Sequence, residues 1–175
     1  LRSRQGHNID PTQLTFRSGD SLLACLPCRT VDSLILLDTN VVSELRRPRP
    51  HGAVVAWVQD QPDSHLFVSA VTLGEIQAGI ELTRAQDEAK AAAIENWLDR
   101  VSAVWNVLPM DAMVFRAWAR LMHGRSDTLY EDAMIAATAQ VHGLTVATRN
   151  VGDFRALGMS PFNPFDTAPP APPSR

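Results

Sequence analysis

The stretch Leu34-Ile35-Leu36-Leu37-Asp38 places an unbroken run of large apolar residues directly before a carboxylate. A short run of this kind, which here follows Ser33, is typical of a strand buried on both faces of a parallel sheet. Ligands of parallel α/β sheets bind at the carboxyl ends of the strands, so Asp38 is a candidate functional residue. The alternative is a helix cap, because Asp38, Thr39 and Asn40 are all of types favoured at helix N-termini.

Strand-like and helix-like segments alternate along the rest of the chain. Apolar runs and helical spacing predict strands at 33–37, 66–68, 105–108 and 144–148, helices at 40–46, 52–59, 71–84, 87–104, 111–123 and 131–142, and a polar turn at 149–153. This alternation predicts an α/β fold with a central, mostly parallel sheet of about four to five strands flanked by helices.

The 175 residues fit one domain with extensions at both ends. Residues 1–33 lack periodicity and are interpreted as an N-terminal extension of unclear origin, with the folded domain at 34–166. Residues 167–175 hold four of the twelve prolines, so we expect a disordered, Pro-rich tail. Cys25 and Cys28 form a lone C-x-x-C, which we interpret as two ordinary thiols because the chain has only 2 cysteines.

Composition and motifs exclude several classes of protein. No apolar run approaches the ~20 residues that span a bilayer, so we expect no membrane insertion. The G-x-S-x-G, G-x-x-x-x-G-K-[ST], H-E-x-x-H and G-x-G-x-x-G motifs do not occur. The net charge is −3, so a nucleic-acid partner would need local positive patches. Arg46, Arg47 and Arg149 are candidates for contacts to nucleic-acid phosphates; the alternative is a solvated helix end.

Further carboxylates lie at positions that allow either a functional or a purely structural interpretation. Glu75 lies on a predicted helix and is either functional or part of a solvated face. Asp132 shares an apolar stripe of its helix, where an unpaired charge is costly, so a cation is its natural partner; N-terminal capping is the alternative. Asn150 and Asp153 follow the last predicted strand and either serve the site or cap a turn.

Three or four carboxylates at one edge of a sheet would form the oxygen-rich site that Mg²⁺ or Mn²⁺ prefers. Such a cation activates water, which can attack a phosphodiester while the cation offsets the charge developing on the phosphate. The residues therefore predict metal-dependent hydrolysis of phosphodiester bonds.

Four segments in this order resemble a known family: LLDTNVVSE at 36–44, SAVTLGEI at 69–76, DAMIAATA at 132–139 and ATRNVGDF at 147–154. Together they are similar to the PIN-domain toxins of the VapBC type, especially the FitB-like branch, over about residues 34–165. The resemblance implies the toxin component of a type II toxin-antitoxin system. Its implied activity is that of a Mg²⁺- or Mn²⁺-dependent endoribonuclease that cleaves RNA with metal-activated water.

The resemblance also assigns the site. Asp38, Glu75 and Asp132 match three acidic metal ligands of the family. Asp153 matches the fourth acidic ligand in the FitB-like form, whereas some other branches carry an aspartate where this chain has Asn150. Either one or two cations are compatible with these ligands. Thr39, Asn40, Thr148 and Asn150 match residues that support the ligands.

The same resemblance implies the partners: an RNA substrate, a VapB/FitA-like antitoxin and a second copy of the chain, with interfaces formed by helices within residues 40–104. An RNA substrate implies a cytoplasmic location. Two other functions stay open, namely a non-catalytic PIN-like module that binds the antitoxin, and a nuclease of the same fold outside any toxin-antitoxin system.

Overall fold

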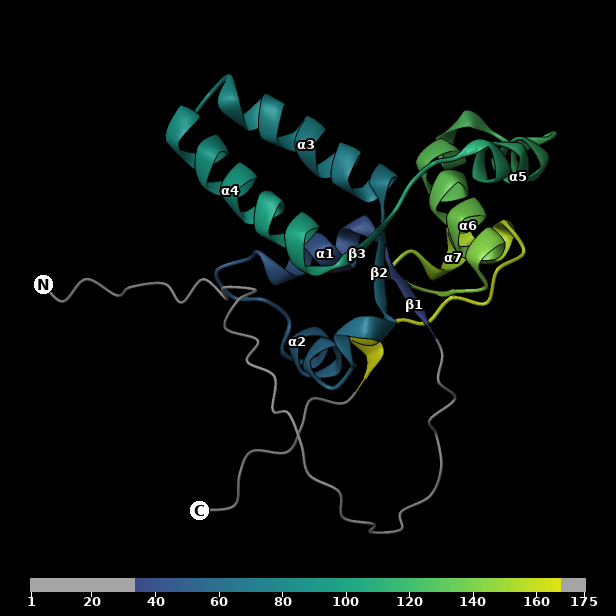
Figure 1. Ribbon diagram of the computed structural model, residues 1–175, viewed down its shortest axis with the longest axis horizontal. Coiled ribbons are helices and arrows are strands. Elements are labelled where there is room, and N and C mark those ends of the chain that lie inside the picture. Colours follow the sequence, from purple (N-terminus) through teal and green to yellow (C-terminus); the bar gives the residue numbers. More distant parts are fainter. Residues whose placement is uncertain (1–33, 168–175) are drawn as a thin grey trace, which may run out of the picture.

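The computed structural model describes residues 34–167, which form a three-layer α/β/α domain (Figure 1). The N-terminal extension, with Cys25 and Cys28, and the tail from residue 168 onward lie outside the described residues. No helix in the described range is long and apolar enough to cross a membrane.

The sheet has four parallel strands in the order β3-β2-β1-β4: β1 (Ile35–Leu37), β2 (Leu66–Ser69), β3 (Asn106–Leu108) and β4 (Thr145–Ala147). Leu36 pairs with Phe67 on one side and Val146 on the other, so β1 is central. All pairs are parallel, which confirms the predicted sheet. Phe162 adds an isolated parallel bridge to Ala147 at the edge of β4.

Helices cover both faces of this sheet because alternate residues of its strands point to opposite sides. Ile35 and Leu37 pack with α1 (Thr39–Leu45), α2 (Gly52–Gln59), α3 (Ala70–Arg84) and α4 (Glu88–Val104). Leu36, between them, packs on the other face with α6 (Tyr130–His142) and α7 (Val151–Ala156). The strand is buried throughout, as its unbroken apolar run predicts.

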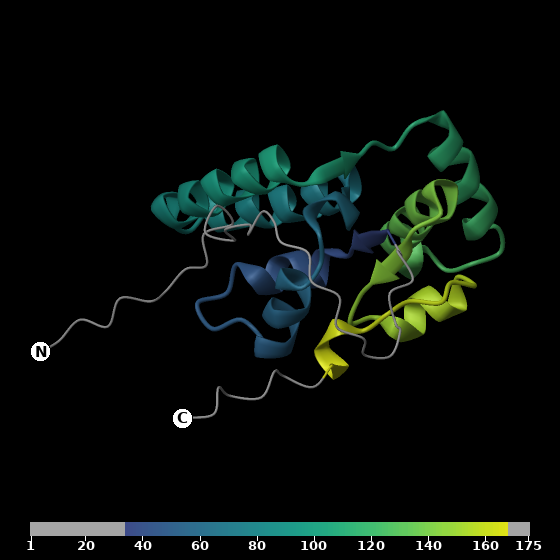
Figure 2. The ribbon, with the colours of Figure 1, turned by 60° about the horizontal axis from the view of Figure 1, so that its bottom comes forward.

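The remaining helix, α5 (Ala112–Met122), packs along α6, and short 3₁₀ turns occupy Asp63–His65, Asp127–Leu129 and Pro164–Asp166 (η2, η3 and η4). Figure 1 shows α3 and α4 as a long pair on one side of the sheet and α5, α6 and α7 on the other. Figure 2 shows the chain after α7 returning past β4 to η4, which lies against α2.

One sequence prediction about the elements is wrong. The sequence predicts a polar turn at 149–153, but α7 begins at Val151. This helix has only six residues and includes Gly152, so it offers too few positions for an apolar period to show. Phe154, which is fully buried, packs it against the core that contains Leu36.

Candidate active site

Asp38 lies at the carboxyl end of the central strand, directly before α1. Its backbone N–H continues the sheet by donating to the carbonyl of Ala147 (3.0 Å), and its side chain accepts from the backbone N–H of Thr39 (2.7 Å). Asp38 is thus the N-cap of α1, as the capping alternative predicts. The cap engages only Oδ1, and Oδ2 points to other partners.

Two side chains hold that second oxygen. Thr148 Oγ1 and Asn40 Nδ2 each donate to Asp38 Oδ2 at 2.5 Å. Thr148, fully buried after β4, also accepts from Asn40 Nδ2 (3.1 Å) and from the backbone N–H of Asn150 (2.8 Å). Asn40 Oδ1 in turn accepts from the backbone N–H of Arg149 (3.0 Å). This network fixes the Asp38 carboxylate between the ends of β1 and β4.

Burial nevertheless dominates the ionisation of Asp38, which is only 3% exposed. Desolvation raises its pKa above the ordinary value, the hydrogen bonds from Thr148, Thr39 and Asn40 act in the opposite direction, and the nearby charge of Glu75 adds to the rise. A second carboxylate therefore lies within electrostatic range of the first.

Glu75 comes from the second turn of α3 and is half-buried. Thr39 Oγ1 donates to Glu75 Oε2 at 2.5 Å, so Thr39 touches both acids: Asp38 through its backbone and Glu75 through its hydroxyl. Desolvation raises the pKa of Glu75 first, opposed by the Thr39 bond, and the charges of Glu131 and Asp132 raise it further. Glu75 is thus not simply on a solvated face.

Asp132 lies in the first turn of α6, on the opposite side of the sheet's edge. The helix N-cap is Leu129, with no side-chain cap bond, so Asp132 does not cap its helix. Burial raises the pKa of Asp132 to about 6, with further contributions from the charges of Asp38, Asp153 and Glu131. The described part of the chain supplies no hydrogen-bond donor to this carboxylate.

Asp153 and Asn150 belong to the segment after β4. Asp153 lies in the first turn of α7, exposed, and its charge acts on Asp132. Asn150 occupies the N-cap position of α7 but makes no side-chain cap bond; its backbone instead donates to Thr148. Asp153 is thus the member of this pair in electrostatic contact with another acid of the set, Asp132.

The predicted basic residues have different surroundings. Arg47 and Arg149 lie 3.0 and 3.7 Å from Glu44 Oε2, a buried carboxylate of α1 that also accepts from the backbone N–H of His51. Arg149 additionally lies over the ring of Phe165, 3.9 Å from its centroid. Arg46 forms no ion pair within residues 34–167. Their role towards RNA stays a prediction.

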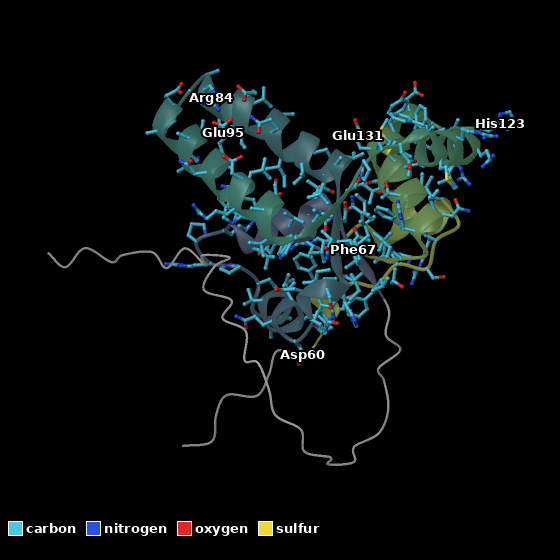
Figure 3. All side chains as sticks on the ribbon, viewed as in Figure 1. Asp60, Phe67, Arg84, Glu95, His123 and Glu131 are labelled. Carbon is cyan, nitrogen blue, oxygen red and sulfur yellow. The ribbon has the colours of Figure 1, made fainter. Side chains whose placement is uncertain are left out.

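Sequence reasoning missed two acids near the site. Glu131, exposed in the first turn of α6, raises the pKa of both Glu75 and Asp132, and its position next to Asp132 was the available signal (Figure 3). Glu44, which pairs with both Arg47 and Arg149, was missed because its burial results from the packing of α1 in the tertiary fold. No local pattern carries that information.

The donor chemistry of the four acids fits a hard divalent cation. They offer carboxylate oxygens alone, and desolvation and mutual repulsion raise the pKa values of Asp38, Glu75 and Asp132, a strain that a cation would relieve. Within residues 34–167, no three Asp, Glu, His or Cys side chains already surround one point as a ready ligand set. The four acids thus match a divalent cation in the type of their ligand atoms and in their charge.

The fold and the sequence together define the class of protein. The PIN domain family matches residues 35–158, nearly all of the described domain, so the chain belongs to this family. Within it, the chain is a member of the VapBC-type toxin ribonucleases, in the FitB-like branch.

Three relatives support this placement. The chain is 36% identical to Toxin FitB of Neisseria gonorrhoeae over 139 residues, covering 75% of this chain and 99% of FitB. It is 36% identical to VapC ribonuclease Y4jK of Sinorhizobium fredii over 143 residues, 77% of this chain and 100% of the relative. The crystal structure of FitAcB from Neisseria gonorrhoeae superposes with a TM-score of 0.68 at 35% identity, covering 76% and 99% of the two chains.

Proposed function

We propose that this protein is the toxin of a type II toxin-antitoxin system and cleaves RNA as a Mg²⁺- or Mn²⁺-dependent endoribonuclease. The observation that carries the proposal is a chain of electrostatic contacts among four carboxylates from different elements near the carboxyl edge of the sheet: Asp38, Glu75, Asp132 and Asp153. The names of the relatives, Toxin FitB and VapC ribonuclease Y4jK, favour RNA as the substrate.

These four acids would hold the cation, with Asp153 rather than Asn150 as the fourth. A bound Mg²⁺ or Mn²⁺ supplies Lewis-acid chemistry: it lowers the pKa of a water nucleophile and offsets negative charge on the phosphate. Hydrolysis then needs neither a histidine nor a covalent intermediate.

The chain's own residues contribute orientation. Asn40 and Thr148 hold one oxygen of Asp38 and the α1 backbone holds the other, so this carboxylate is positioned before any ligand arrives. Thr39 links Asp38 to Glu75 in the same way. The guanidinium of Arg149, fixed by Glu44 and Phe165, lies beside this rim and is suited to an RNA phosphate.

The partners follow from the family. The solved structures similar to this chain include FitAB bound to a DNA fragment, which supports a FitA- or VapB-like antitoxin for this chain. A homodimer and a cytoplasmic site of action belong to the same proposal, as does the use of helices within residues 40–104 for the interfaces.

The test is cleavage of total RNA by the purified protein with Mg²⁺ or Mn²⁺, with EDTA, and with Asp38→Asn. Asp99→Asn, at an exposed acid of α4, is the matched control because it removes one charge away from the site. We expect the wild type and Asp99→Asn to cut with the cation, and Asp38→Asn to lose at least a hundredfold in rate, on the order of one lost electrostatic contact to the reacting group.

Equal cutting by Asp38→Asn would contradict the assignment of the site. A wild type that binds the product of the neighbouring gene but leaves RNA intact would favour the non-catalytic module. RNA cleavage without toxicity in cells, or toxicity that no neighbouring gene relieves, would place the enzyme outside a toxin-antitoxin system.

A further inference from the structure

A polar hollow of about 550 Å³ lies beside the candidate active site, between α7 and the segment that returns to η4. Asp153 forms part of its wall, and the charge of Asp153 acts on Asp132, so the hollow adjoins the candidate active site. Its other lining includes two arginines, Arg149 and Arg155, and one aromatic ring, Phe162. The roles assigned above leave Arg155 and Phe162 unexplained.

Phe162 is presented rigidly to this hollow. Its backbone N–H donates to the carbonyl of Val146 (2.8 Å), and its carbonyl accepts from the N–H of Thr148 (2.9 Å), so it extends the sheet beyond β4. The Phe162 ring packs against Trp57, with 5.1 Å between centroids and a 37° tilt, yet the residue stays 36% exposed. One side of the ring is thus braced and part of it faces solvent.

The same backbone contacts fix the distance between this ring and the catalytic rim. Thr148, which Phe162 binds through the backbone, donates its hydroxyl to Asp38. The ring therefore cannot shift along β4 without moving the threonine that positions Asp38. A ligand on Phe162 would be placed in a defined register relative to the carboxylates.

The charged groups of the hollow suit a phosphate. Arg155 is exposed and forms no ion pair with any residue in the range 34–167, while Arg149 is held by Glu44 and Phe165. Of the two acids in the lining, Asp153 would have its charge offset by the cation, and Asp166 accepts from Asn163 Nδ2 at 2.8 Å. Two guanidinium groups, an aromatic face and an amide side chain suit the binding of a single-stranded nucleotide.

We propose that this hollow is a subsite for a nucleotide of single-stranded RNA next to the phosphodiester that is cut, with its base stacked on Phe162 and a phosphate bound by Arg155. The proposal rests on the proposed ribonuclease function and deepens it, because it makes Phe162 and Arg155 determinants of where the enzyme cuts. Stacking on an aromatic ring tolerates any base, so the subsite selects an unpaired base more than a base identity.

The experiment measures binding separately from cleavage. A fluorescent, mixed-sequence RNA oligomer of about 12 nucleotides is titrated with the full chain in EDTA, where no cutting occurs. The charge of Asp153 is not offset under these conditions, but it is the same in the wild type and in every variant, so differences in affinity report the substituted residue. We expect Phe162→Leu, which keeps apolar contact with Trp57, to weaken binding by about 5- to 100-fold, the range found when base stacking is lost. Phe115→Leu, at an exposed ring of α5, is the matched control and should bind like the wild type.

A second variant tests the phosphate contact on a residue whose loss leaves the core intact. Arg155→Gln should reduce the slope of log K against log salt by about 0.7, the value for one phosphate contact on a single strand. Arg120→Gln, at an exposed arginine in the last turn of α5, should leave the slope unchanged.

Each outcome bears on one proposal. Wild-type RNA affinity in both Phe162→Leu and Arg155→Gln overturns the subsite, even if the wild type cuts RNA with Mg²⁺. RNA binding that depends on both residues, without any metal-dependent cutting by the wild type, supports the subsite and overturns the ribonuclease function. Unchanged RNA affinity together with weaker antitoxin binding would assign the hollow to a peptide and likewise overturn the proposal.

Discussion

Asp38 and Asp132 differ in how the fold treats their charge. Asp38 receives three hydrogen bonds from Thr39, Asn40 and Thr148, so it is oriented by the protein itself. Asp132 receives none from the described residues, and burial together with neighbouring charges raises its pKa to about 6. The chain therefore holds the Asp38 carboxylate in place, whereas Asp132 is the acid whose charged form a bound cation would stabilise most.

Removing the hydroxyl of Thr148 tests the orientation of Asp38. Thr148→Val keeps the buried volume but deprives Asp38 Oδ2 of a donor and Asn40 and Asn150 of an acceptor. A hydrogen bond to a charged group contributes roughly 1.5–3 kcal/mol, so we expect a loss of that order in the free energy of unfolding at pH 7.5, measured in urea.

Thr138→Val is the matched control for this loss. Thr138 is equally buried, but its hydroxyl contacts neutral partners, namely the carbonyl of Met134, Met110 Sδ and Ser69 Oγ, so the loss should be nearer 1 kcal/mol. Equal losses in the two variants would mean that the Asp38 network contributes no more than an ordinary buried hydroxyl.

The raised pKa of Asp132 predicts a pH dependence of stability. In the metal-free folded protein Asp132 keeps its proton up to about pH 6, whereas in the unfolded chain it loses it near the ordinary value of 3.8. The folded state thus binds more protons between these values, so the free energy of unfolding falls as pH rises from about 4 to 6 and stays lower above. Asp38 and Glu75, whose pKa values are also raised, act in the same direction.

Asp132→Asn removes this cost. We expect the variant to melt at a higher temperature than the wild type at pH 7.5 in EDTA, and the difference to shrink towards pH 4, as measured by calorimetry. Asp99→Asn should show no such pH-dependent gain. A variant less stable than the wild type at pH 7.5 would show that the Asp132 carboxylate has a stabilising partner.

At the scale of elements, the sequence predicts what local patterns encode. The apolar runs at β1 and β4 identify strands, and the polar residues that follow them, Asp38 after β1 and Asn150 and Asp153 after β4, indicate the candidate functional edge because parallel strands end together. The helix α7 was missed because six residues carry no period. Glu44 was missed because only the tertiary fold buries it, and one of its two arginine partners, Arg149, lies far away along the chain.

The end of α6 gives a prediction at this scale. Gly143 terminates the helix with φ at +67°, in the left-handed region that strongly favours glycine. Gly143→Ala should cost about 1–2 kcal/mol in the free energy of unfolding, measured in urea. Gly79→Ala, inside α3 with open space around a new Cβ, should instead stabilise the protein by about 0.5–1 kcal/mol. A change of the same sign in both variants would contradict the backbone conformations assigned to these two glycines.

At the scale of the whole molecule, the strand order places the site. The chain builds β2 and β3 on one side of β1 and then crosses to β4 on the other, so neighbouring crossovers leave the sheet in opposite directions between β1 and β4. Doubly wound sheets bind ligands outside the carboxyl ends of the strands at such a point. Here α3 brings Glu75 from one face and α6 brings Asp132 from the other to the same edge.

This arrangement concentrates negative charge where the two halves of the molecule meet, so cation binding should stabilise the whole domain. At a Mg²⁺ or Mn²⁺ concentration about 100 times the Kd, the gain is roughly 2.7 kcal/mol, or on the order of 5–10 °C in Tm for a domain of this size. EDTA should reverse the shift.

Variants of the site distinguish cation binding by the four carboxylates from an unspecific effect of salt on Tm. Asp38→Asn and Asp132→Asn each remove one carboxylate, from opposite sides of the edge, so both should largely abolish the cation-induced shift in Tm, while Asp99→Asn retains it in full. A shift retained in both site variants would place the cation elsewhere on the molecule. A shift lost in Asp132→Asn but kept in Asp38→Asn would mean that the α6 side alone binds the cation, and the hydrogen-bonded Asp38 would then serve to orient the water or the RNA rather than the cation.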